Sequence, residues 1–209
     1  MLFRSLWVKA YKGHSLGPDT FAFKPGDSLL AACEVRTTDA IYLLDSTGRA
    51  YQIDASTAPT GRGDGAPLST LIDLAQGAKI HSVLSGAPGD FYLFASDSGN
   101  GFLAPLSSLA AQKRAGKAFL KLESGENPMP PLRLPARDAD GAWPGFVVCG
   151  ADNGRMLAFQ AAEINVYEAG GKGVRLMSLD AGEKLTAISY ATGEPVAASV
   201  RVATGQVFH

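Results

Sequence analysis

The sequence contains few metal-binding side chains and no long apolar run. Its 209 residues include two cysteines, Cys33 and Cys149, and three histidines, His14, His81 and His209. The cysteines lie far apart in apolar stretches, so we expect two buried thiols and neither a zinc site nor a disulfide framework. No segment approaches the roughly 18 apolar residues of a membrane-spanning helix. Cations follow the N-terminus too soon for a signal peptide, so we expect a soluble intracellular protein.

The chain also lacks an excess of positive charge. It has 19 lysines and arginines against 20 aspartates and glutamates, a formal net charge of −1. This balance excludes a uniformly basic nucleic-acid-binding protein, but it permits a local basic stripe, because potential depends on how charges are distributed. Apolar residues make up 46% of the chain and charged residues 19%. That composition is globular, and the length suits one domain over residues 1–209.

Signatures of nucleotide binding and catalysis are missing as well. No GxGxxG motif opens a helix, and AGGKGV at 169–174 lacks the serine or threonine that follows the lysine of a P-loop. The histidines stand singly in unrelated contexts. Asp45, Asp97 and Asp152 recur at what we take to be equivalent positions before turn glycines, where a carboxylate most often bonds its own backbone. We therefore expect no catalytic residue and no metal site in this chain.

The glycines that are present recur in a fixed order. Gly48, Gly99, Gly154 and Gly205 each separate two β-rich runs, at intervals of 51, 55 and 51 residues. Each follows a threonine, serine or asparagine. Because glycine supplies the positive φ of a tight turn, each of these segments predicts a β-hairpin.

Two further glycine series lie between the hairpins. Basic loops occur at 9–15, 60–68, 112–118 and 169–174, and we align their glycines, Gly13, Gly63, Gly116 and Gly171. A closing series occurs at 23–29, 74–80, 122–128 and 179–185. Three markers in fixed order at a period of about 50 residues indicate a radial array of β units.

The sequence also suggests two short helical segments, two core tryptophans and a longer parent chain. Segments 106–115 and 160–167 carry a weak helical pattern, and Trp7 and Trp143 lie in strand-like runs and are expected in the core. The sequence begins and ends inside a repeat, so we expect it to be part of a longer protein that continues beyond His209.

The basic loops suggest binding of a polyanion. Glycine-rich loops with lysine or arginine bind phosphates, because free backbone N–H groups and cations converge on one cluster of oxygens. In a radial array the four loops would project from one edge, which suits a long, regular polyanion. The predicted contacts are Lys9, Lys12, His14, Arg49, Arg62, Lys113, Arg114, Lys117, Arg155, Lys172 and Arg175.

The segment QKRAGKA at 112–118 resembles a degenerate gyrase box, Q-[RK]-R-G-G-K-G. Five positions match it: Gln112, Lys113, Arg114, Gly116 and Lys117. Ala115 and Ala118 replace the two other glycines. The flanking segments, among them WVKAYKGHS, DSTGRAYQID and SDSGNGFLAPLSSL, closely resemble the C-terminal domain of the bacterial DNA topoisomerase IV A subunit, in the gyrase A-like C-terminal domain family. The gyrase A subunit is expected to carry an intact box, so the two alanines favour the topoisomerase IV branch.

The resemblance implies an all-β fold, a propeller-like β-pinwheel with about four to five blades here, in an open or incomplete ring. It implies binding and bending of duplex DNA around a basic rim. The parent would be an ATP-dependent type IIA topoisomerase that unlinks daughter chromosomes and relaxes supercoils. Its strand-cleaving tyrosine, ATP and Mg sites would lie on other domains, so this part would be non-catalytic. The implied partners are the ATPase-bearing B subunit and a second A subunit in a heterotetramer, in the bacterial cytoplasm at the nucleoid.

Two other functions stay open at this point. One is the DNA-wrapping C-terminal domain of the gyrase A subunit, although two alanines in place of glycines stiffen the loop and favour bending without full wrapping. The other is a protein-interaction propeller whose cations are merely solvated, which the net charge of −1 supports. A hydrolase on a propeller scaffold would need a cluster of carboxylates or histidines, and no such cluster is visible in the sequence.

Overall fold

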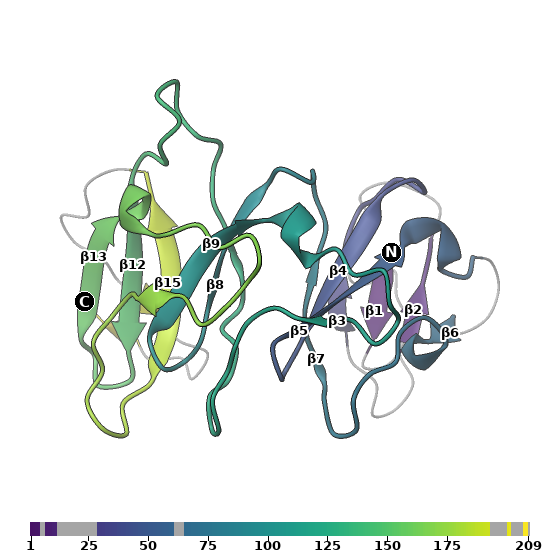
Figure 1. The fold of residues 1–209 in the computed structure, drawn as a ribbon, viewed down its shortest axis with the longest axis horizontal. Helices are drawn as coiled ribbons and strands as arrows, with labels where there is room; N and C mark the ends of the chain where they lie inside the picture. Colours follow the sequence, from purple (N-terminus) through teal and green to yellow (C-terminus); the bar gives the residue numbers. More distant parts are fainter. Residues whose placement is uncertain (5–6, 12–28, 61–64, 193–199, 202–206, 209) are drawn as a thin grey trace. The chain divides into compact units, whose positions relative to one another are not determined.

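The protein is built from antiparallel strands (Figure 1). The computed structural model describes residues 1–4, 7–11, 29–60, 65–192, 200–201 and 207–208. Two compact units divide the chain: residues 1–88 with 109–118, and residues 89–108 with 119–209. Regular structure in the described ranges consists of strands and 3-10 turns, which confirms the predicted all-β class. The helices predicted at 106–115 and 160–167 are wrong, since these segments form only the 3-10 turns η4 (Leu106–Leu109) and η5 (Ala161–Glu163).

The first unit contains two four-stranded sheets, with strand orders β3-β1-β2-β6 and β10-β5-β4-β7. The strands of the first sheet are β1 (Leu2–Arg4), β2 (Trp7–Lys9), β3 (Leu29–Ala32) and β6 (Ala66–Pro67). Those of the second are β4 (Ala40–Asp45), β5 (Arg49–Asp54), β7 (Ile80–Leu84) and β10 (Lys117–Ala118). The 3-10 turns η2 (Ala55–Thr57) and η3 (Leu68–Thr70) follow β5 and β6. The central strand β4 is buried along almost its whole length, because sheet strands cover both of its edges.

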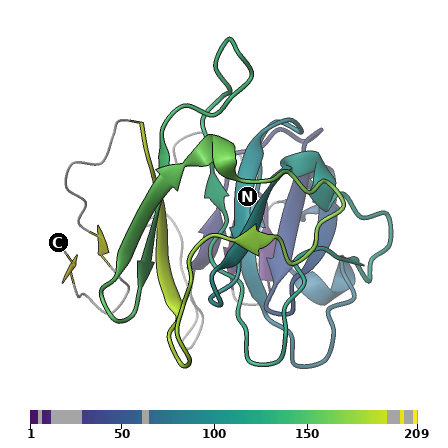
Figure 2. The same ribbon diagram turned by 60° about the vertical axis from the view of Figure 1, so that its left-hand side comes forward.

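The second unit contains a four-stranded sheet of order β11-β8-β9-β14, a three-stranded sheet of order β13-β12-β15 and a two-stranded pair, β16-β17 (Figure 2). The first sheet comprises β8 (Phe91–Ala95), β9 (Asn100–Pro105), β11 (Leu132–Arg133) and β14 (Val174–Arg175). The others comprise β12 (Phe146–Ala151), β13 (Met156–Gln160), β15 (Leu185–Ala191), β16 (Val200–Arg201) and β17 (Val207–Phe208). One apolar cluster around Leu103, Val147 and Cys149 forms the core of this unit.

The turn glycines form the predicted hairpins. Gly48, Gly99 and Gly154 have φ values of 81°, 82° and 86°. The amide of each donates at 3.0 Å to the carbonyl oxygen three residues earlier. The hairpin prediction is therefore confirmed at these three glycines, whereas Gly205 lies outside the described residues.

The closing loops dock onto the hairpin turns of their own repeats. In each turn the amide two residues before the glycine donates to a carbonyl in the closing loop. The three bonds run from Ser46 to Lys79 at 2.8 Å, from Asp97 to Asn127 at 2.9 Å and from Asp152 to Lys184 at 3.0 Å. The accepting residue stands two positions after the closing glycine in every case, so this repeated bond explains why the closing glycine series accompanies the hairpins. Most of the first closing loop, residues 23–28, lies outside the described residues.

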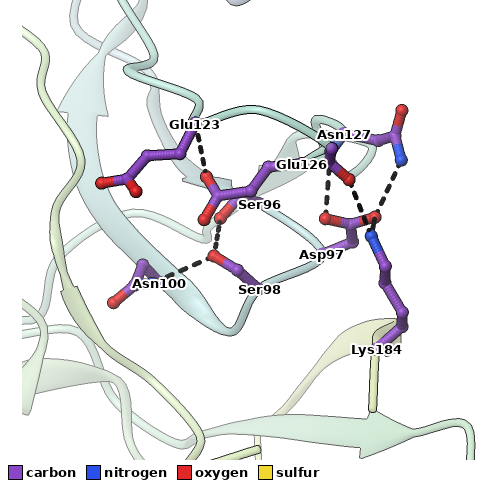
Figure 3. Close-up of polar contacts among 9 residues, drawn as sticks. Ser96, Asp97, Ser98, Asn100, Glu123, Glu126, Asn127 and Lys184 are labelled. Carbon is purple, nitrogen blue, oxygen red and sulfur yellow. Dashed lines mark hydrogen bonds and ion pairs between the residues drawn. The ribbon is translucent and has the colours of Figure 1, made fainter. Parts of the chain in front are cut away.

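The predicted equivalence of Asp45, Asp97 and Asp152 is wrong. Asp45 stands three residues before its turn glycine and bonds its own turn, where Oδ1 accepts from the Thr47 and Arg49 amides at 2.8 and 3.0 Å. Asp97 and Asp152 stand two residues before theirs. The Asp97 carboxylate instead accepts from Asn127 at 2.9 Å and from Lys184 at 2.6 Å (Figure 3). It therefore links three segments of the second unit.

The two tryptophans differ from one another. Trp143 is only 7% exposed and packs in the second core, as predicted. Trp7 is 38% exposed on the short strand β2, so its placement in the core was wrong. A three-residue strand offers one buried position, which Val8 occupies with no exposure.

The Asp97 network predicts an acid-dependent loss of stability. Burial alone would raise the pKa of Asp97, but the bonds from Lys184 and Asn127 hold it below its usual value. A carboxyl group whose pKa is lower in the folded state stabilises the fold at every pH above its unfolded-state pKa of about 3.9. This stabilisation is lost as the pH falls through the folded-state pKa. Asp97→Asn should lower the free energy of unfolding of the second unit at pH 7 by about 1–3 kcal/mol. The difference from the parent should shrink below about pH 4, as urea titrations at pH 7 and pH 3 would show.

Asp152→Asn is the matched control for this prediction. Asp152 holds the same turn position but is exposed, and its carboxylate makes no bond within the described residues. We expect a change within about 0.5 kcal/mol at both pH values. Equal losses for the two variants would contradict a specific role for Asp97.

Candidate nucleic-acid interface

Each described basic loop ends in a short strand that pairs with the hairpin of the preceding repeat. Strand β6 pairs with β2, β10 with β5 and β14 with β9. The paired residues include Ala66 with Val8, Lys117 with Ala50 and Val174 with Gly101. Each loop is therefore attached to a neighbouring repeat by main-chain bonds, which fixes where its cations lie relative to that hairpin.

A glycine directly before each of these strands makes the close approach possible. Gly65, Gly116 and Gly173 have φ values of 97°, 62° and 82°. A Cβ on any of them would lie well under 3.0 Å from a carbonyl oxygen of the facing strand. The facing oxygens belong to Val8, Ala50 and Gly101. Both the sterics and the backbone conformation therefore require glycine here.

This geometry corrects the alignment of the basic loops. The residue equivalent to Gly116 is Gly173 and not Gly171, since only Gly173 precedes the paired strand and closes on its neighbour. Gly65 is the equivalent in the earlier loop. Gly13 and Gly63 lie outside the described residues. In the loops of Gly65 and Gly173 the aligned glycine was two residues too early, because loops rich in glycine offer several candidates within a few residues, whereas Gly116 was aligned correctly.

Arg49 anchors the gyrase-box loop. Its Nη2 donates to the carbonyl oxygens of Ala115 at 2.8 Å and Gly116 at 3.1 Å, and its Nε donates to Ala115 at 3.2 Å. The side chain thus ties the second hairpin strand to the loop that pairs with it. Arg49 brings a positive charge to the loop, but its Nε and Nη2 donate to backbone carbonyls.

The box cations belong to the loop that Arg49 binds. Arg114 forms an ion pair with Asp73 at 3.2 Å and donates to the Ser69 carbonyl at 2.9 Å. Lys113 is exposed and Lys117 is half-buried, and neither has an ion-pair partner among the described residues. The box loop of the first unit therefore presents two lysines whose charges are not locally compensated.

The second unit presents a similar but smaller group. Lys172 pairs with Glu123 at 2.7 Å, and this contact lowers the pKa of Glu123 and raises that of Lys172. Arg175 is exposed on β14. Lys172 and Arg175 thus lie on one loop and its strand, which faces Asn100 and Gly101 of β9.

Arg155 does not join a basic loop within the described residues. It follows Gly154 as Arg49 follows Gly48, but it precedes β13, which is an edge strand in a three-stranded sheet. Its guanidinium pairs with Glu183 and donates to the Ser178 carbonyl at 3.0 Å. The prediction that Arg155 contacts DNA has less support than that for the box cations.

Of the remaining predicted contacts, only Lys9 lies in a described range. Its Cβ lies beside Gly65, and its ammonium stacks over the Tyr11 ring at 4.8 Å, so it flanks the earliest described basic loop. Lys12, His14 and Arg62 lie outside the described residues.

The structure also bears on metals, membranes and thiols. Among the described residues no three histidine, cysteine or acidic side chains cluster as metal ligands. In the same ranges, no helix has the length and apolar character needed to cross a bilayer. Burial raises the pKa of the Cys149 thiol to about 12, whereas Cys33 is only half-buried.

The chain is similar to proteins of known family and structure. A family model described as "DNA gyrase C-terminal domain, beta-propeller" matches residues 90–127 and 145–191. The solved C-terminal domain of Escherichia coli ParC is 30% identical and superposes with a TM-score of 0.82, covering 90% of this chain and 77% of that one. The chain belongs to the DNA gyrase C-terminal domain family. Both the predicted resemblance and the β-pinwheel fold are thereby confirmed.

Whole relatives extend well beyond this domain. The A subunit of DNA topoisomerase 4 from Neisseria gonorrhoeae is 36% identical over 86% of this chain, and its Escherichia coli K12 counterpart is 33% identical over 85%. The chain spans 23% of the length of either protein. It therefore corresponds to a C-terminal domain of such proteins.

The glycine geometry predicts a large cost for one substitution. Gly116→Ala would place a methyl group against the Ala50 carbonyl and the Tyr51 ring, in addition to the cost of positive φ. We expect a loss of more than about 2 kcal/mol in the free energy of unfolding. Gly77→Ala, in the same unit, has positive φ but open space around the added atom, and should cost only about 1–2 kcal/mol. Denaturant titrations of both variants would show whether the close approach matters.

Proposed function

We propose that this domain binds duplex DNA through its basic loops. The observation that carries the proposal is the repeated loop construction, in which a positive-φ glycine and a short paired strand position each group of cations. Flexible surface lysines would scatter over the molecule, whereas these cations lie in or next to equivalent loops of two repeats. The family resemblance points in the same direction, since the matched relatives are named as A subunits of DNA topoisomerase 4.

The contacts would go chiefly to phosphates. Lys113, Lys117 and Arg175 have no ion-pair partners within the described residues, and lysine binds phosphate as a point charge without reading bases. Arg114 and Lys172 already pair with carboxylates, so each would have to exchange a carboxylate for a phosphate. Binding should therefore depend weakly on sequence and strongly on salt.

We further propose that the parent protein is the A subunit of a type IIA topoisomerase, topoisomerase IV, and that this domain captures and bends DNA for it. A gyrase-like wrapping domain is the alternative. Ala115 and Ala118 favour bending, because Ala118 sits in the paired strand β10 and leaves the box with one positive-φ residue, Gly116. The parent would act with the ATPase-bearing B subunit and a second A subunit in the bacterial cytoplasm, at the nucleoid.

Salt titration gives a direct test of DNA binding. Each neutralised phosphate contributes about −0.9 to the slope of log K against log salt concentration. Contacts to roughly four to eight phosphates predict a slope of about −4 to −7 in filter binding with the domain and a duplex. No binding at low salt, or a slope near zero, would instead favour the protein-interaction propeller.

The gyrase-box cations can be tested by substitution. Replacing Lys113, Arg114 and Lys117 together with glutamine should weaken binding to every duplex about equally and reduce the magnitude of the salt slope by about 2–3. The matched control replaces Arg36, Lys79 and Arg133, which are exposed and lie outside the basic loops and the strands β2, β5 and β9 that pair with them. An equal loss in the control would argue for a diffuse charge effect, and unequal losses among duplex sequences would argue for base readout.

A further inference from the structure

A hollow of about 670 Å³ lies in the second unit beneath the loop that joins β11 to β12. Figure 1 shows this green loop projecting beyond the strand ends. The residues lining the hollow include Phe91, Leu134, Pro135 and Trp143, with Arg133 and Arg137 among them. Its volume falls in the range of small-ligand and peptide pockets. The predicted DNA contacts do not include any of these residues.

The loop is closed by its own hydrogen bonds. The Asp138 carboxylate accepts from the amides of Asp140 and Ala142 at 3.0 and 2.9 Å. The Asp138 amide donates to the Ala142 carbonyl at 2.8 Å. This closure brings together the two residues that flank it, so that the Arg137 guanidinium lies 4.2 Å from the centre of the Trp143 ring and 4.6 Å from that of Phe91.

The hollow presents one cation without a partner. Arg137 is exposed and stacks on two aromatic rings, and it has no hydrogen-bond or ion-pair partner within the described ranges. The Nε1 of Trp143 and the hydroxyl of Tyr190 also lack partners, but both atoms have almost no accessible surface, so a ligand in the hollow would not reach them. The Arg137 guanidinium is therefore the donor group that a ligand could use.

The register of the sheet separates this hollow from the basic loop. Phe91 pairs with Pro105 at the open end of the β8–β9 hairpin. The basic strand β14 pairs with Asn100 and Gly101, at the turn end. A ligand in the hollow would therefore sit at the opposite end of this hairpin from Lys172 and Arg175.

We propose that this hollow binds an acidic peptide segment, with a carboxylate on Arg137 and an aliphatic side chain against Phe91 and Trp143. A carboxylate offers acceptors only, which matches the unpaired Arg137 guanidinium. Arg133 already binds the Asp90 carboxylate at 2.8 Å, so a carboxylate fits beside this wall. The apolar lining favours a peptide over DNA, because a phosphate backbone brings no aliphatic group. The proposal does not rest on DNA binding by the basic loops.

A peptide titration tests the proposal. In a Trp7→Phe background Trp143 is the only tryptophan, so its fluorescence and its single indole N–H resonance report on the hollow. The probe is acetyl-Glu-Glu-Leu-Glu-Glu-amide, and its neutral counterpart carries glutamine at every glutamate. We expect saturable changes in both signals with the acidic peptide alone. Arg137→Gln should weaken binding about tenfold or more, and the exposed control Arg36→Gln should not.

Three results would overturn the proposal. They are no saturable change in either signal, equal responses to the acidic and neutral peptides, and unchanged affinity in Arg137→Gln. A titration of the same variants with duplex DNA tests whether DNA, and not a peptide, occupies the hollow. If Arg137→Gln lowered DNA affinity and left peptide affinity intact, the hollow would be a DNA contact and not a peptide site.

Discussion

The described basic loops depend on one contact, the close antiparallel approach of each loop's end to the hairpin of the preceding repeat. At Gly65, Gly116 and Gly173 the chain takes a positive φ and passes so near a facing carbonyl that no side chain fits. Two residues of strand pairing follow each glycine. Without this approach the cations would sit on free loops, and their spacing would be set by chain entropy instead of by the sheet.

The same contact explains the difference between buried and exposed hairpin strands. The second hairpin strands β5 and β9 are largely buried, and each carries a loop strand on its outer edge. Strand β13 has no such neighbour among the described residues, and Leu157 on it is 42% exposed. The burial of the second hairpin strands therefore goes with the outer strand that the following repeat adds to the sheet.

The period, the hairpins and the all-β class could be predicted from the sequence because glycine positions are local and obey backbone sterics. The sequence could not predict which glycine in a loop makes the close approach to the facing strand. Gly171 and Gly173 look alike in AGGKGV, and only the pairing of Val174 with Gly101 distinguishes them. Likewise Asp45 and Asp97 both precede turn glycines, but one bonds its own turn and the other bonds Asn127 and Lys184, far along the chain. Such contacts are set by tertiary structure, which local patterns do not encode.

Local pairing of charges explains how basic loops exist on a chain of net charge −1. Arg114 and Lys172 each pair with an acid of their own unit, so part of the positive charge of each loop is compensated. These exposed pairs are weak, on the order of 1 kcal/mol or less, so a phosphate can displace the carboxylate at small cost. Lys113 and Lys117 remain available from the start. Under the proposed function, a near-neutral chain would thus keep a polyanion-binding surface whose arginine and lysine charges are partly paired until a polyanion displaces the carboxylates.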